Sequence, residues 1–102
     1  MIHVIAVITA KPGQRETILA HARANLAAVR TEKGFIEYGP VVDADPALPF
    51  QAKLGPDTFM FVEKWESMDA LKAHSAAPHM AAYGAKTKEH IASRVIHILQ
   101  GA

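Results

Sequence analysis

The segment Ile2–Thr9 restricts the possible folds more than any other part of the sequence. It reads IHVIAVIT, so nearly every position is apolar or β-branched. A strand with one face in water usually alternates apolar and polar residues, whereas a strand covered on both faces is a continuous apolar run. The sequence therefore predicts a first strand that is buried on both faces of its sheet.

Further periodic patterns follow this strand. From Gln14 onward an apolar stripe recurs at helical spacing and predicts an amphipathic helix of about five turns, capped at Gly34. The stripe consists of Ile18, Ala22, Leu26 and Val29. The segments Phe35–Val42 and Thr58–Trp65 are rich in β-formers and are predicted strands. Alternate side chains of the second segment share one face, namely Phe59, Phe61, Glu63 and Trp65.

A long irregular segment separates these two strands. Asp43–Asp57 contains three prolines and no periodicity, so it is predicted to be a loop of a length that lids and binding loops often have. After Thr58–Trp65, Ser67 is a suitable N-cap for a short helix. Val95–Leu99 is the last predicted strand. Before it, Pro78 begins another helical stretch with an apolar stripe formed by Met80, Tyr83, Thr87 and Ile91.

Length and composition exclude several classes of protein. The chain has 102 residues, which suits one domain over residues 1–102. Eleven Lys and Arg stand against ten Asp and Glu, so nucleic acid and membrane surfaces are not expected partners. The absence of Cys excludes disulfides and thiolate metal sites. No apolar run is long enough to span a membrane, and Met1 leads directly into a strand-like segment without a basic region, so no leader and a cytoplasmic location are expected.

The order of the predicted elements is strand, helix, strand, strand, helical pair, strand. This β-α-β-β-α-β order is that of the α+β ferredoxin-like fold, in which helices cover one face of a four-stranded antiparallel sheet. The other face then lacks a cover, although the first strand is apolar on both sides. A second copy of the chain is the simplest cover, so a homodimer is expected.

The segment Phe61–Met80, which reads FVEKWESMDALKAHSAAPHM, resembles the antibiotic biosynthesis monooxygenase family. These proteins are small dimeric α+β barrels and include cofactor-independent quinol monooxygenases. The resemblance extends over nearly the whole chain, from the apolar first strand through the Pro-Gly turn and the Gly-Phe step. Its most specific residues are Trp65, Glu66, Ser67, Ala70, Leu71, His74, Pro78 and His79.

The resemblance implies that the protein oxygenates a quinol-like or polycyclic phenol with O2, without flavin, haem or metal. Such a reaction requires an apolar pocket, a base that removes a phenolic proton, and a hydrogen-bond donor. Haem-degrading relatives pair an Asn on the first strand with the Trp of the third. Haem degradation is therefore not expected here, because Ile2–Thr9 contains no Asn.

Ten residues are candidates for this pocket. His74 and His79 are candidate bases, since the ordinary pKa of imidazole is near neutrality. Trp65 could stack on an aromatic substrate, and Tyr83 could hydrogen-bond to its oxygen. Each of these four candidate catalytic residues also has a purely structural interpretation as a core, boundary or capping residue. The candidate substrate-binding residues are His21, Asn25, Phe35, Tyr38, Phe61 and Glu63.

Other functions remain open at this level. An isomerase or lyase acting on a small oxygenated or phosphorylated metabolite could use the same histidines, and a non-catalytic ligand-binding dimer could use the same pocket. The six His are scattered and form neither a His-Glu-x-x-His nor a His-x-His arrangement. The sequence therefore predicts no metal site.

Overall fold

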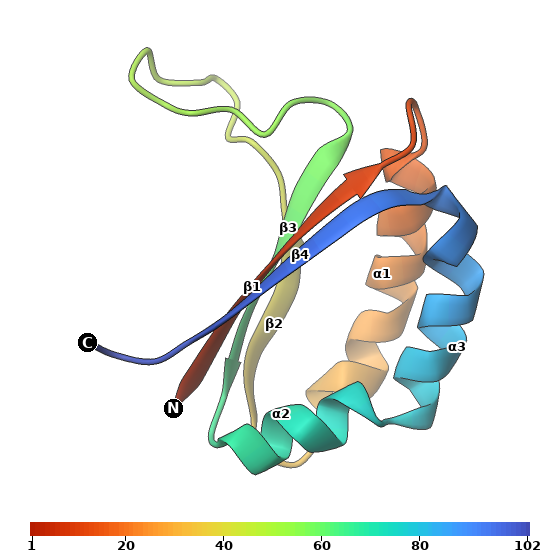
Figure 1. Ribbon diagram of the computed structural model, residues 1–102, viewed down its shortest axis with the longest axis vertical. Helices are drawn as coiled ribbons and strands as arrows, with labels where there is room; N and C mark the ends of the chain where they lie inside the picture. The colour runs from red at the N-terminus through yellow and green to blue at the C-terminus, as the bar shows by residue number, and fades with distance from the viewer.

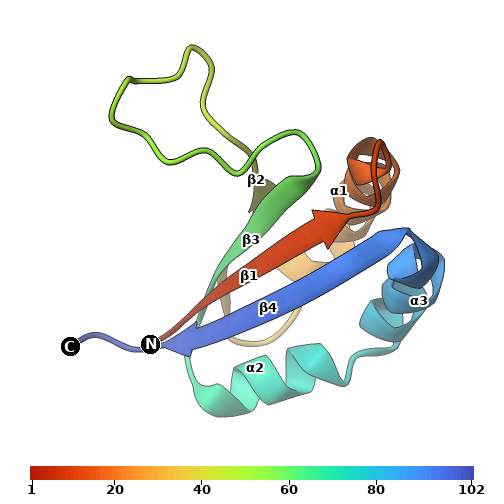
Figure 2. The same cartoon turned by 45° about the horizontal axis from the view of Figure 1, so that its top comes forward.

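Four antiparallel strands form one sheet in the order β2-β3-β1-β4, and the helices lie on one face of it (Figures 1 and 2). The computed structural model describes residues 1–102. The strands are β1 (Ile2–Ala10), β2 (Phe35–Val41), β3 (Thr58–Trp65) and β4 (Ile91–Leu99), and the helices are α1 (Arg15–Arg30), α2 (Met68–Ser75) and α3 (Pro78–Thr87). A short 3-10 turn, η1 (Lys88–His90), joins α3 to β4. This arrangement confirms the predicted ferredoxin-like fold.

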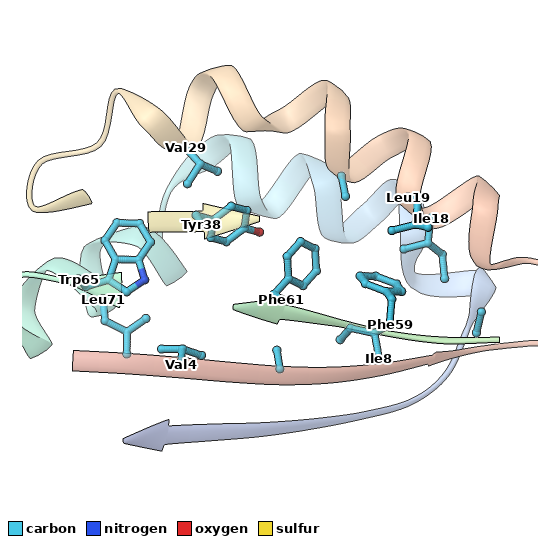
Figure 3. Packing of buried hydrophobic residues seen from close by; sticks show 13 residues of the cluster. Val4, Ile8, Ile18, Leu19, Val29, Tyr38, Phe59, Phe61, Trp65 and Leu71 are labelled. Carbon is cyan, nitrogen blue, oxygen red and sulfur yellow. The ribbon is translucent and has the colours of Figure 1, made fainter. Parts of the chain in front are cut away.

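Aromatic side chains fill the space between α1 and the sheet (Figure 3). The predicted alternation along β3 is confirmed, because Phe59, Phe61, Glu63 and Trp65 share one face and are all buried, whereas the residues between them are only half-buried. Each inner residue of β3 lies beside an inner residue of β1, as in the pairing of Ala6 with Phe61. The helix contributes Ile18, Leu19, Ala22 and Val29 to this core.

The prediction that β1 is buried on both faces is wrong for the single chain. Val4, Ala6 and Ile8 point toward the helices and are buried, whereas Ile5 and Val7 on the opposite face are only half-buried. The reason is that all three helices pack on one side, so nothing in this chain covers the outer face of the sheet.

Two predicted boundaries also differ from the structure. Helix α1 ends at Arg30 and not at Gly34, because residues 31–34 form a turn that leads into β2. Gly34 does have a positive φ of 83°, and a Cβ at this position would lie 2.5 Å from the Cβ of Ala70. Ile91 begins β4 instead of ending a helix, because η1 redirects the chain after Thr87. Ile91 still packs against the core.

Residues 42–57 form the predicted loop, which extends away from the sheet and the helices (Figure 1). The carboxylate of Asp43 closes its base by accepting hydrogen bonds from the backbone N–H groups of Leu54 and Gly55. Phe50 in this loop is 85% exposed. None of the helices of the protein combines the length and the apolar character that crossing a membrane requires.

Candidate active site

A cavity of about 750 Å³ lies between the sheet and the two C-terminal helices. Strand β1 contributes Val4, Ala6 and Ile8 to its floor, and strand β4 contributes Ile96 and Ile98. These two β4 residues are 50% and 52% exposed, so the cavity is open along that strand. The remaining walls are formed mainly by Tyr38, Phe61, Leu71, Met80 and Tyr83. A pocket of this size and apolar character suits a ligand of several rings.

The carboxyl group of Glu63 is the acidic group on this cavity's inner wall. Glu63 is 6% exposed and accepts a hydrogen bond of 2.9 Å from Nε1 of Trp65 to its Oε1. Burial raises the pKa of Glu63 above its ordinary value, because removal from water disfavours the charged form. The indole donor acts in the opposite direction and limits this rise.

Glu63→Gln is expected to weaken the pH dependence of stability. Because the folded pKa of Glu63 is raised above its ordinary value of 4.5, the folded protein holds a proton that the unfolded chain releases. The stabilising contribution is complete below pH 4.5 and is lost as the pH rises through the raised pKa. Denaturant unfolding between about pH 4 and pH 8 should show this loss in the wild type and less of it in Glu63→Gln.

Glu66→Gln is the matched control, because Glu66 is an exposed carboxylate three positions further along the chain. The unfolding free energy of Glu66→Gln should change with pH as that of the wild type does. An unchanged profile in Glu63→Gln would show that Glu63 is not the group responsible.

His74 comes from the last turn of α2, which Ser67 begins by accepting a hydrogen bond from the backbone N–H of Ala70. The residue as a whole is 4% exposed. Its ring centroid lies 4.5 Å from that of Trp65 and 5.3 Å from that of Tyr38. This packing holds the imidazole against the inner end of the cavity.

Each ring nitrogen of His74 faces a carboxylate. Nδ1 lies 2.8 Å from Oε2 of Glu32, and Nε2 lies 4.0 Å from Oε1 of Glu63. A hydrogen bond to Glu32 places a proton on Nδ1, so in the neutral imidazole the lone pair is on Nε2. This nitrogen is on the side of Glu63, which also lines the cavity.

Glu32 joins a second histidine to this group. Nε2 of His79 lies 3.0 Å from the same Oε2 that contacts His74. His79 follows Pro78 at the first turn of α3, and Glu32 lies in the turn between α1 and β2. The close packing of Gly34 against Ala70 brings that turn next to α2. One carboxylate therefore links the two candidate bases.

Two tyrosines of the cavity wall are held in the neutral form. Burial is the main cause that raises the pKa of Tyr83 to about 12, and burial also raises the pKa of Tyr38. The Tyr38 ring stacks on Phe61 with centroids 5.1 Å apart. At neutral pH both hydroxyls can donate a hydrogen bond to an oxygen in the cavity.

The ten candidate residues divide into two sets. Five of them line the cavity: Tyr38, Phe61, Glu63, His74 and Tyr83. The other five do not line it: His21, Asn25, Phe35, Trp65 and His79.

The second set has identifiable neighbours. Trp65 reaches the cavity only through Glu63 and His74, and Phe35 packs edge-on behind the indole. Asn25 donates to the Met80 sulfur at 3.3 Å, whereas His21 is half-buried on α1.

Sequence reasoning missed several residues of this region. The first helix was predicted to extend to Gly34, so Glu32 was expected on a helix, whereas it lies in the turn between α1 and β2. No spacing in the chain connects it with His74 or His79. Lys88, Ser93 and Arg94 line the cavity near the start of β4. Ser93 and Arg94 were missed because the last strand was predicted to begin at Val95, and Lys88 lay within the predicted helical stretch that begins at Pro78.

Comparison with a family model and with known proteins places the chain in one family. The family model described as antibiotic biosynthesis monooxygenase matches residues 1–86. A protein of Escherichia coli (strain K12) named "Probable quinol monooxygenase YgiN" is 37% identical over 102 residues, which cover 98% of this chain and 97% of that protein.

Two solved structures show the same fold. The crystal structure of an antibiotic biosynthesis monooxygenase has a TM-score of 0.80 at 23% identity and covers 100% of this chain and 99% of its own. A conserved protein from Methanosarcina mazei Go1 has a TM-score of 0.83 at 19% identity and covers 99% of this chain and 92% of its own.

Proposed function

Because this chain belongs to the antibiotic biosynthesis monooxygenase family, we propose that it is a cofactor-independent monooxygenase that oxidises a quinol-like or polycyclic phenol with O2. The observation that carries the proposal is the arrangement of His74. Its Nδ1 is held by Glu32, and its Nε2 is on the side of Glu63 at the inner end of an apolar cavity.

In the proposed reaction Nε2 of His74 removes the phenolic proton of the substrate. The resulting phenolate is electron-rich and reduces O2 directly, and the apolar lining of the cavity offers few partners to water. For a hydroquinone the balanced products are a hydroxyquinone and water. One oxygen atom enters the ring, the other leaves as water, and the substrate supplies all the electrons.

The walls of the cavity match such a substrate. The rings of Tyr38, Phe61 and Tyr83 offer aromatic surface, and the two hydroxyls can donate to substrate oxygens. A cavity of about 750 Å³ is in the range that holds drug-sized ligands, so it exceeds the needs of a single-ring quinol. This favours a substrate with several fused rings or a large substituent.

The proposal includes a homodimer in the cytoplasm, with a small aromatic substrate and O2 as the partners of each chain. Strand β4 carries Val95, Ile96, Ile98 and Leu99 with exposures of 45% to 52%. The residues of β4 face both sides of the sheet, and apolar residues exposed together on a sheet edge favour pairing with a second copy. Light scattering of the purified chain checks this assembly.

Oxygen consumption tests the proposal directly. Metal-free protein is placed in a closed electrode cell with a panel of hydroquinones and anthrone-like phenols, and the rate is compared with autoxidation. We expect uptake above this blank that survives a chelator, with oxygenated product of matching yield. Absence of uptake across the panel would overturn the oxygenase proposal in favour of an isomerase, a lyase or a ligand-binding dimer.

A further inference from the structure

We propose that Glu32, His74 and His79 form a binding site for a divalent transition metal ion, for which zinc is the best match. The donor atoms are Oε2 of Glu32, Nδ1 of His74 and Nε2 of His79, and all three lie within 4.8 Å of one another. The carboxylate oxygen is 2.8 Å from one nitrogen and 3.0 Å from the other.

The two distances at Glu32 are close to those between neighbouring ligands of a metal ion, and the two imidazole nitrogens lie within 4.8 Å of each other. Zinc binds imidazole nitrogen and carboxylate oxygen at about 2.0 to 2.2 Å, so neighbouring ligands of a tetrahedral ion are about 3.3 Å apart. The two distances at Glu32 are shorter by only about 0.3 to 0.5 Å, and small side-chain rotations supply this difference. Two imidazoles and one carboxylate also leave a coordination position for water, as in zinc sites with three protein ligands.

The three donors come from segments that the fold holds in place independently. Glu32 lies in the turn that packs on Ala70 through Gly34, His74 ends the buried face of α2, and His79 begins α3 after Pro78. The site therefore exists before a metal arrives, which lowers the conformational entropy lost on binding.

Burial and charge also favour a cation at this point. The side chains of Glu32, His74 and His79 are 12%, 5% and 27% exposed, so the site is shielded while His79 still borders solvent. Glu63 lies behind His74, with Oε1 4.0 Å from Nε2. At this distance Glu63 makes no hydrogen bond with the imidazole, and a negative charge on its carboxyl group favours a cation bound to the ring.

One consequence rests on the proposed function, whereas metal binding itself does not. A metal ion on Nδ1 of His74 takes the lone pair of that nitrogen, and the neutral imidazole then keeps its proton on Nε2. Nε2 can no longer accept a proton from a phenol. Zinc binding and the proposed base function of His74 therefore exclude each other, and zinc is expected to inhibit oxygen uptake.

Isothermal titration of metal-free protein with zinc chloride tests the site without any substrate. We expect one zinc ion per chain in the wild type. Glu32→Gln and His79→Gln each remove a ligand and should weaken binding by at least about 100-fold, since loss of an outer partner alone costs about 10- to 100-fold. Cobalt(II) should give the visible absorption of a tetrahedral complex in the wild type and lose it in both variants.

His97→Gln is the control, because it removes an exposed imidazole on the opposite face of the sheet. It should bind zinc like the wild type. Circular dichroism shows whether Glu32→Gln and His79→Gln are folded. If one of them has a folding defect, zinc binding by the other variant still tests the site. No binding in the wild type, or binding that survives both ligand substitutions, would show that the cluster is only hydrogen-bonded.

The inhibition assay separates the two proposals. If zinc binds with the expected variant pattern and slows oxygen uptake reversibly, the metal site and its overlap with the base are both supported. If zinc binds in this pattern while uptake on an active substrate is unaffected, the metal site stands and the role of His74 as base is overturned. If no substrate is ever consumed, the titration alone decides on the site.

Discussion

His74→Ala is expected to lower kcat for an oxidised phenol by about 10²- to 10⁴-fold, the range typical of a lost general base. His74 is the only histidine that lines the cavity, and Nδ1 of its imidazole is held by Glu32. Oxygen uptake measured against substrate concentration gives kcat and KM separately. The substitution removes proton acceptance and leaves the aromatic walls intact, so kcat should fall much more than KM rises.

The control for this experiment is His97→Gln, whose side chain lies on the other face of the sheet. It should keep the wild-type kcat, and both variants should keep the wild-type circular dichroism spectrum and mass in solution. A His74→Ala protein that is folded and turns over at the wild-type rate would eliminate His74 as the base. A rise in KM alone would assign it to substrate binding.

Trp65→Ala is expected to lower the free energy of unfolding by about 3 to 5 kcal/mol, as for other buried aromatic residues that are cut back to Ala. The indole is 0% exposed and packs between Phe35 and His74. The substitution also removes the donor to Oε1 of Glu63. Because domains of this size have a total stability of about 5 to 15 kcal/mol, much of the variant could unfold under mild conditions.

Equilibrium unfolding in urea measures this effect, with Phe50→Ala as the matched control. Phe50 is 85% exposed, so its loss should change the unfolding free energy by no more than about 0.5 kcal/mol. The loss of unfolding free energy in Trp65→Phe should lie between those of Trp65→Ala and Phe50→Ala, because Phe keeps most of the buried aromatic surface but lacks the indole donor. Equal losses in Trp65→Ala and Phe50→Ala would contradict the assignment of Trp65 to the core.

Local signals in the chain were sufficient for most of the fold. Ser67 caps α2 and Pro78 begins α3, because the capping oxygen and the proline ring act on backbone only a few residues away. Alternation along Thr58–Trp65 correctly placed Glu63 and Trp65 on the same face, which the structure shows to be the buried one. These features depend on spacing within one element, which the sequence displays directly.

Boundaries and the burial of β1 were less predictable. The apolar stripe that ends at Ile91 continues at helical spacing, yet the chain leaves α3 after Thr87 and Ile91 reaches the core from β4. A single apolar residue can meet the same core from a helix or a strand. The second face of β1 depends on what packs against it, and no pattern within the strand specifies that.

The candidate site was predicted in part. Tyr38, Phe61, Glu63, His74 and Tyr83 do line one cavity, and their roles in binding and catalysis remain predictions. The sequence by itself determined the order of helices and strands and, for Phe61, Glu63, His74 and Tyr83, which neighbours share a face with each residue. It did so because helical and strand periodicity are properties of neighbouring residues.

Only the tertiary structure decided that Glu32 meets His74 and His79. These pairs are 42 and 47 positions apart in the chain, and a turn, the end of α2 and the start of α3 bring them together. Their contact depends on how Gly34 packs against Ala70 and on where two helices dock on the sheet. Such distant packing leaves no periodic trace in the sequence, so this cluster became visible only in three dimensions.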